Sequence, residues 1–259
     1  EYANYIKQNY LTTGSKIIEI GSNDGTCLKN FKDNNYEYIG FEPSSNVAEV
    51  ANKNRINTLN NFFGLQSIDL IKNFKGKTDV IYAANVICHV PDLNNLIKTV
   101  DKLLSKNGVF IFEEPYLGSM FQKTSYDQIY DEHIFMFSAT SVKKIFNLFD
   151  MDLINLIKQS THGGSMRYVI ARKGNHNIEK NVNLILNEEK LKNLDNINSC
   201  LEFKNNCENS KHKLNKLLKK LKDDGKKIAG YAATSKSTTI LNYCKIDNNI
   251  IDFICDTTK

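Results

Sequence analysis

Three absences restrict the class of protein that this sequence encodes. No stretch approaches the roughly 20 consecutive apolar residues that a membrane-spanning helix needs, so we predict no membrane span and no membrane partner. No basic-then-apolar leader opens the chain, so we predict no export signal. None of the six cysteines forms a C-x-x-C pair, and we therefore predict no metal site in this sequence and a cytoplasmic protein with reduced thiols.

The composition is that of an ordinary globular protein. With 259 residues, 41% of them hydrophobic and 24% charged, the chain is long enough for one large domain or one and a half smaller ones. The net charge of +5 gathers mostly near 211–227, which suits an anionic substrate without requiring nucleic acid. Because the chain begins at Glu1 rather than Met and stops soon after an apolar run, we expect it to be a piece of a longer protein.

Short apolar runs alternate with stretches of helical periodicity over residues 1–173. We predict buried strands over 16–20, 36–41, 79–83 and 109–112. We predict helices over 2–10, 27–31, 47–52, 93–104 and 141–149. Strands that alternate with helices indicate an α/β fold with a doubly wound, mostly parallel sheet. Two later runs, 153–158 and 166–172, are predicted to form a hairpin that places one antiparallel strand at the edge of the sheet.

The composition changes at Gly174. From about 178 to 224 leucines recur at helical spacing, which predicts one or two long amphipathic helices. Beyond them, a strand over 227–231, a helix ending near Leu241 and a strand over 250–254 indicate the start of another βα unit. We therefore divide the chain into an α/β domain, a helical linker and the beginning of a second Rossmann-like domain, over 1–173, 174–224 and 225–259.

The strongest local signal is the loop Glu19–Gly25, which lies between a predicted strand and a helix. Open α/β sheets bind ligands at the carboxyl ends of their strands, and Gly21 and Gly25 let the backbone turn tightly and approach a ligand. The spacing is not G-x-G-x-x-G, and no P-loop lysine follows. A dinucleotide or a nucleoside triphosphate is therefore a poor fit.

Other residues suit the rest of an adenosine ligand. Glu42 ends the second strand about 20 residues beyond the loop, where a carboxylate can accept both ribose hydroxyls. Phe62 and Phe63 offer an aromatic wall for adenine, and 84–86 follow a later strand into the same crevice. An adenosine with a positively charged, phosphate-free tail describes S-adenosylmethionine. The alternative is an ordinary glycine turn beside a surface glutamate. The residues predicted to bind the cofactor are Glu19, Gly21, Ser22, Asn23, Gly25, Glu42, Phe62, Phe63, Ala84, Asn85, Val86 and His89.

A second cluster of chemically active groups lies in the run 126–133, after the end of a predicted strand at 113–116. A histidine with an unperturbed pKa of about 6.5 suits general base work, so His133 is the candidate base. A carboxylate such as Glu132 can orient it. The alternative is a polar surface loop with a packed histidine.

Three further residues each allow two interpretations. His89 suits either a pocket or the start of a helix capped by Asp92. His162 lies in a glycine-containing loop between two predicted strands. This loop serves either as a turn alone or as a turn that also contacts a ligand. Lys236 sits where a βα turn can hold phosphate, or it is simply solvated.

The chain resembles the C-methyltransferases that act on nucleotide-linked keto-deoxysugars, such as the C-3 methyltransferases of antibiotic sugar pathways. The run SYDQIYDEH…FSATS is specific, whereas the glycine loop alone is not. The matching segments are 19–25, 84–92, 114–118, 126–141, 161–172, 230–244 and 256–258. The family combines a zinc-binding N-terminal domain, a Rossmann-like methyltransferase domain and a C-terminal Rossmann-like domain. By this resemblance the chain lacks the first and most of the third, so zinc is expected only in the missing N-terminal part.

The resemblance implies a metal-free reaction that consumes S-adenosylmethionine and yields S-adenosylhomocysteine. His133 corresponds to the base, with Tyr130 and Glu132 beside it, and His89 to another active-site histidine. A ketone at C-4 acidifies the C-3 proton, the base removes it, and the enolate carbon attacks the methyl group. The partner is then a nucleotide-sugar small molecule. Residues expected to contact it are Glu114, Tyr116, Tyr126, His162 and Lys236.

The motifs argue against several rival functions. A dehydrogenase would need the missing G-x-G-x-x-G loop. A nucleic-acid amino-methyltransferase would show Asp/Asn-Pro-Pro-aromatic where this chain has 84–87, so no nucleic-acid partner is expected. Two alternatives stay open, namely an inactive methyltransferase fold that serves as a binding module and a small-molecule methyltransferase of another substrate class. The sequence does not identify the sugar, the methyl stereochemistry or the oligomeric state. It also leaves the nucleotide open, because residues 232–235 depart from the family pattern.

Overall fold

The computed structural model describes residues 1–32 and 35–257, and over this part the chain forms a seven-stranded sheet with the order β3-β2-β1-β4-β5-β7-β6. The strands are β1 (Lys16–Ile20), β2 (Glu37–Phe41), β3 (Thr58–Leu59), β4 (Thr78–Ala84), β5 (Leu104–Pro115), β6 (Met151–Gln159) and β7 (Ser165–Arg172). The order reverses direction at β1, as in a doubly wound sheet. The expected mostly parallel α/β fold is confirmed.

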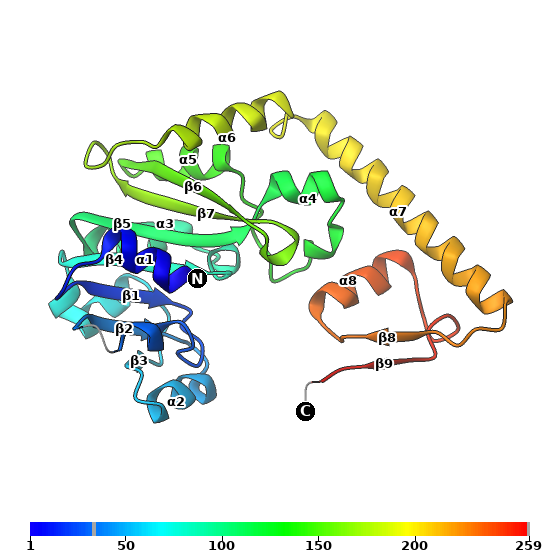
Figure 1. Cartoon of the computed structure of the whole chain (residues 1–259), viewed down its shortest axis with the longest axis horizontal. Helices are drawn as coiled ribbons and strands as arrows, with labels where there is room; N and C mark the ends of the chain where they lie inside the picture. The colour runs from blue at the N-terminus through cyan, green and yellow to red at the C-terminus, as the bar shows by residue number, and fades with distance from the viewer. Residues whose placement is uncertain (33–34, 258–259) are drawn as a thin grey trace.

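Helices cover both faces of this sheet (Figure 1). The α-helices are α1 (Tyr2–Tyr10), α2 (Ser45–Lys53), α3 (Leu93–Leu103), α4 (Leu117–Lys123) and α5 (Ala139–Asn147). The 3₁₀ helices are η1 (Leu28–Phe31), η2 (Leu65–Phe74), η3 (Ile87–His89), η4 (Tyr126–Gln128) and η5 (Thr161–Gly163).

The apolar runs of the central strands explain why they are buried on both sides. Neighbouring residues of a strand point to opposite faces of the sheet. Ile18 therefore packs in one core with residues of α3 and α5, and Ile17 in a second core with residues of α1. The central strands form the rigid base from which the loops at their carboxyl ends extend.

The expected antiparallel pairing of the last two strands is correct, but the expected position of the antiparallel strand is wrong. β7 lies between β5 and β6 and is antiparallel to both, so the edge strand β6 runs parallel to β5. The burial pattern gives the reason, since every residue of β7 except Arg172 is buried, as suits an inner strand, whereas β6 is partly exposed. Arg167 on β7 also forms a buried ion pair with Glu113 on β5.

The rest of the chain forms two helices and a small second unit, which Figure 1 shows leading away from the sheet domain along the long helix α7. Its elements are α6 (Lys180–Leu191), α7 (Ile197–Asp223), β8 (Ala229–Tyr231), α8 (Ser235–Cys244) and β9 (Phe253–Cys255). β8 and β9 are parallel, as expected. The last strand is shorter than the predicted 250–254, because Ile250 and Ile251 pack against the third core cluster instead.

The third core cluster determines where the second unit docks. It joins the sheet domain to α7 and α8, and it consists of Met120, Tyr126, Phe203, Cys207, Leu218, Cys244 and Ile246. In contrast, α6 packs on the sheet domain, because Val182 and Ile185 belong to the first core. The division of the chain at 173 and 224 stays a proposal. Among the described residues, no helix is both long and apolar enough to cross a bilayer.

Candidate active site

The loop Glu19–Gly25 leaves β1 with a geometry that depends on its glycines. Gly21 has a φ of +66° and Gly25 a φ of +81°, a region that favours glycine. A Cβ atom on Gly21 would lie 2.5 Å from Cγ2 of Val86, and one on Gly25 would lie 2.8 Å from Cγ2 of Ile56. Gly21 therefore packs directly against the segment that follows β4, and Gly25 against the segment that precedes β3.

Glu42 is bound to the same loop. Its Oε2 accepts the Asn23 backbone N–H at 3.1 Å, and its Oε1 accepts the Ser44 N–H at 2.9 Å. Glu42 is only 8% exposed. Each carboxylate oxygen has a second lone pair, so the group can still accept hydroxyl protons. The structure thus brings Glu42 and Asn23 together.

Polar atoms without partners lie in this loop and in the turn after β4. Ser22 Oγ and Asn85 Oδ1 are buried and have no hydrogen-bond partner in the described part of the chain. Buried polar groups are nearly always paired, so such atoms point to a missing polar ligand or to water. Asn85 is at a φ of +55° and donates its N–H to the Glu113 carbonyl at 2.8 Å, which holds the turn after β4.

Glu19 is buried below the loop, and burial raises its pKa to about 8. Hydrogen bonds from the Tyr82 side chain and the Leu28 backbone lower this pKa only in part. Of the expected aromatic wall, Phe63 packs edge-on against Phe41 with ring centres 5.3 Å apart, whereas Phe62 is 69% exposed. The half-buried Ala84 ends β4 beside Asn85.

Glu114 has a different position from the one expected of a substrate contact. It is 0% exposed, and its Oε1 accepts the backbone N–H groups of Val86 at 2.9 Å and Ile87 at 2.6 Å. The carboxylate therefore fixes the turn after β4 from below. Tyr116 is also turned inward, since its hydroxyl donates to Glu189 Oε1 on α6 at 2.9 Å. Tyr126 packs in the third core cluster.

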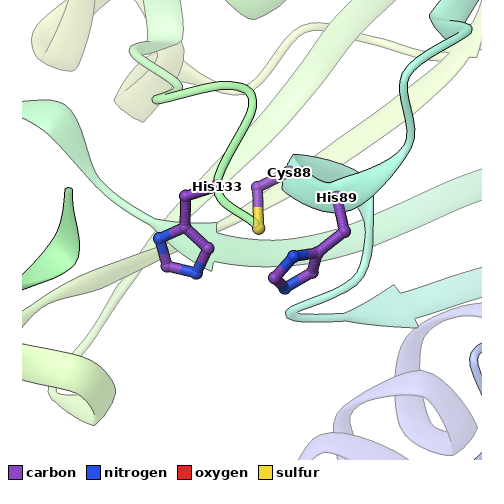
Figure 2. A group of neighbouring side chains, drawn as sticks. All are labelled: Cys88, His89 and His133. Carbon is purple, nitrogen blue, oxygen red and sulfur yellow. The ribbon is translucent and has the colours of Figure 1, made fainter. Parts of the chain in front are cut away.

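His133 lies beside His89, with ring centres 5.0 Å apart (Figure 2). Its Nδ1 is 2.8 Å from the Gln128 carbonyl oxygen, and its Nε2 is 2.7 Å from the Tyr130 hydroxyl. A carbonyl oxygen only accepts, so Nδ1 carries the proton and the neutral ring accepts at Nε2. Burial lowers the pKa of His133, and the nearby His89 and Lys236 lower it further. The ring is thus neutral at neutral pH, as a base must be.

The sequence suggested that the Glu132 carboxylate orients this imidazole. In the structure it does not. The residue is exposed, and its backbone carbonyl accepts from His89 Nδ1 at 2.7 Å. Gln128 takes the orienting role through its own carbonyl, and its side chain donates to the His162 carbonyl at 2.9 Å. Sequence analysis missed Gln128 because a main-chain acceptor leaves no signal in residue type.

The structure brings His162 and Lys236 together, although 74 residues separate them. Lys236 Nζ is 3.3 Å from His162 Nδ1. Burial and the lysine charge lower the pKa of His162. Beside Lys236, a cavity of about 430 Å³ is bounded by Tyr130, Asp131 and the first residues of α8. The amino end of α8 and Tyr130, whose hydroxyl is 2.7 Å from His133 Nε2, thus line one cavity.

The sequence predicted no metal site, and that prediction stays untested. Among the described residues, Cys88, His89 and His133 place a potential ligand atom each within 4.8 Å of one another. Figure 2 shows the Cys88 sulfur between the two rings. A single cysteine such as Cys88 gives no metal signal in the sequence, where closely spaced cysteine pairs are the diagnostic pattern.

Two protein families match the chain. Residues 2–156 match the family described as methyltransferase domain. Residues 160–259 match the family described as C-methyltransferase C-terminal domain. In sequence, the chain is similar to the C-methyltransferase NovU of Streptomyces niveus, with 28% identity over 249 residues. This match covers 96% of the chain but only 59% of NovU, so the chain spans less than two thirds of that relative.

Solved structures share the fold. The PH0226 protein of Pyrococcus horikoshii has a TM-score of 0.52 at 18% identity, covering 67% of this chain and 92% of that one. A TehB-like SAM-dependent methyltransferase of Corynebacterium glutamicum has a TM-score of 0.50 at 12% identity, covering 66% of this chain and 86% of that one. The expected Rossmann-like methyltransferase fold is confirmed. Because the matched residues 2–156 make up more than half of the sequence, the chain belongs to the methyltransferase domain family.

Proposed function

We propose that the protein is an S-adenosylmethionine-dependent C-methyltransferase that methylates C-3 of a nucleotide-linked 4-keto-deoxysugar. The similarity to a C-methyltransferase supports methylation at carbon. The observation that carries the proposal is the geometry of His133, whose Nδ1 is held by a carbonyl while Nε2 is an acceptor. A base of this kind is what removal of a carbon-bound proton requires.

The residues at the end of β1 fit S-adenosylmethionine. Gly21 leaves a side-chain-free surface, and Ser22 Oγ and Asn85 Oδ1 are buried without partners. Glu42 keeps free lone pairs for the ribose hydroxyls, and the loop would hold the methionine tail. The cofactor, when bound, supplies an electrophilic methyl group and leaves as S-adenosylhomocysteine.

The reaction at the sugar begins at His133. Nε2 takes the C-3 proton, and the electron pair of the broken C–H bond forms the enolate double bond between C-3 and C-4. Tyr130 donates to Nε2 in the structure. When the sugar occupies this position, the hydroxyl turns to the C-4 oxygen and stabilises its negative charge. The enolate electron pair would then form the bond from C-3 to the methyl carbon as the methyl–sulfur bond breaks, and holding both reactants in line would contribute to the rate.

The cavity beside the base supports a diphosphate-linked substrate. It is bounded by Tyr130 and the amino end of α8, and backbone N–H groups at such an end favour anions. Lys236 adds a positive charge. We therefore place the diphosphate near Lys236 and the sugar ring near Tyr130 and His133.

The proposal is tested by methyl transfer. The protein is incubated with labelled S-adenosylmethionine and a panel of nucleotide-linked 4-keto-deoxysugars, and mass spectrometry locates the label. We expect label on C-3 and, by calorimetry, binding of S-adenosylmethionine but no comparable binding of NAD. Cofactor binding with no transfer to any keto-sugar would instead support an inactive binding module, and transfer to another small molecule would support a methyltransferase of a different substrate class.

A further inference from the structure

Cys88, His89 and His133 form a cluster that the methyl transfer does not explain. Cys88 is buried and follows Ile87 in η3, and His133 comes from the loop after η4. Their potential ligand atoms lie within 4.8 Å of one another, and Figure 2 shows the sulfur between the two imidazole rings. A methyltransferase base needs neither a thiol nor a second imidazole at this distance.

The hydrogen bonds of both histidines place the lone pair on the same ring atom, Nε2, which in His133 accepts from the Tyr130 hydroxyl that a metal would displace. Nδ1 of His89 is 2.7 Å from the Glu132 carbonyl, and Nδ1 of His133 is 2.8 Å from the Gln128 carbonyl. Since carbonyl oxygens only accept, both Nδ1 atoms carry protons and both Nε2 atoms carry lone pairs. Histidines that bind metals in proteins are usually held in this way by an acceptor on the other nitrogen.

We propose that Cys88 Sγ, His89 Nε2 and His133 Nε2 bind a zinc ion or a similar divalent transition metal. Zinc prefers thiolate and imidazole ligands with Zn–S of about 2.3 Å and Zn–N of about 2.0–2.1 Å, which places neighbouring ligands about 3.5 Å apart. The potential ligand atoms already lie within 4.8 Å of one another, and metal binding would draw them to this spacing. Three protein ligands leave a fourth position of a tetrahedral zinc for water.

Binding changes the protonation of the thiol. Burial raises the pKa of Cys88, and the adjacent Glu114 raises it further. The S–H bond breaks as the S–metal bond forms, and the proton passes to solvent, so metal affinity rises with pH. The negative charge of the thiolate is then offset by the cation.

A bound metal and the proposed base use the same atom. Nε2 of His133 cannot both hold zinc and accept a proton, so the metal-bound protein is an inhibited form. This inference goes beyond the proposed function, because metal binding requires neither cofactor nor sugar. Each can therefore fail without the other.

Cobalt(II) tests the site directly. The 259-residue chain is titrated with cobalt(II) alone, without cofactor or substrate, and its absorption spectrum is recorded. We expect one equivalent to produce visible bands of a tetrahedral ion together with a thiolate-to-cobalt band in the near ultraviolet. Zinc should displace the cobalt and remove both.

Matched variants locate the ligands. Cys88→Ser should lose the thiolate band, whereas Cys200→Ser, which changes an exposed cysteine on α7, should keep it. His89→Ala should weaken cobalt binding at least tenfold while retaining the thiolate band at saturation. Circular dichroism confirms the fold of each variant. Absence of cobalt bands in the wild-type chain, or an unchanged thiolate band in Cys88→Ser, would overturn the proposal.

Discussion

The two halves of the candidate site are built in different ways. The cofactor half, made of the loop Glu19–Gly25, Glu42 and Asn85–Val86, lies at the ends of adjacent strands and is held by buried backbone contacts. The substrate half, made of Tyr130, His133, His162 and Lys236, consists of half-buried or exposed side chains.

This difference determines what each half depends on. The cofactor half follows from the sheet, because its pieces lie where parallel strands end. The substrate half exists only where the third core cluster docks α8 against η4, and it joins segments as far apart in sequence as His162 and Lys236. Variants should therefore affect one half without the other.

The largest effect is expected at His133. With a 4-keto nucleotide sugar and S-adenosylhomocysteine in heavy water, methyl transfer is blocked but the C-3 proton should still exchange for deuterium. His133→Ala should slow this exchange by about 10²–10⁴-fold, the usual contribution of a general base, and leave cofactor affinity unchanged. Nuclear magnetic resonance follows the exchange.

The pH dependence of that exchange reports on the same group. Burial lowers the pKa of His133, so the wild-type rate should hold as pH falls through the usual histidine value of about 6.5 and decline only at lower pH. If His133→Ala keeps full exchange while His89→Ala abolishes it, the roles of the two histidines are reversed.

The next effect concerns the stability of the cofactor half. Burial raises the pKa of Glu19 to about 8, so the folded state holds a proton that the unfolded chain releases near its ordinary value of 4.5. The contribution of Glu19 to wild-type stability should therefore be most favourable below about pH 4.5 and fall by several kcal/mol as pH rises toward about 8. Glu19→Gln, which stays neutral, should remove this decline in thermal unfolding scans. If Glu19→Gln lost stability with rising pH as the wild type does, another group would be the cause of the decline.

Glu42→Ala should weaken the cofactor half and leave the substrate half intact, whereas His133→Ala should do the reverse. Hydrogen bonds to a charged group contribute roughly 1.5–3 kcal/mol, so S-adenosylmethionine should bind about 10–150-fold more weakly by calorimetry. Glu49→Ala, at an exposed glutamate of α2, is the matched control and should bind normally. Equal losses in both variants would argue against a ribose contact.

Lys236→Ala should affect only the substrate half. The lysine is half-buried and reachable by salt ions, so the loss of its charge should raise the KM for the nucleotide sugar by about tenfold or less and more strongly at low salt. Cofactor affinity should not change. The control is Lys219→Ala, at an exposed lysine on α7, and an equal effect there would reduce the role of Lys236 to general charge.

The same comparison shows what could be read from the sequence. The buried strands were predictable because short continuous apolar runs bounded by glycines are typical of strands that are buried on both faces. The position of β7 was not, since strand order depends on pairing across the sheet and β6 and β7 are both apolar. Of the proposed contacts, those at Gly21, Glu42 and Asn85 follow the strand ends and could be predicted from the sequence.

The sequence said less about contacts that use the main chain. The buried carboxylate of Glu114 binds backbone N–H groups, and Gln128 orients His133 through a carbonyl. The residue type shows that a side chain can titrate, but it does not show which neighbouring group that side chain contacts. Glu114 was therefore expected at the substrate, and Gln128 was overlooked.

The smallest effect is expected at Glu132, and it decides between the two accounts of how the base is oriented. If the carboxylate oriented His133, Glu132→Gln would lower the exchange rate strongly. In the structure the carboxylate is exposed and the Gln128 carbonyl holds Nδ1, so only a long-range charge effect remains. That charge raises the pKa of His133, and its removal should shift the pH profile of exchange slightly toward acid. The rate at neutral pH should change less than tenfold, since exposed charge interactions contribute about 1 kcal/mol or less. A loss as large as that of His133→Ala would restore the carboxylate to the orienting role.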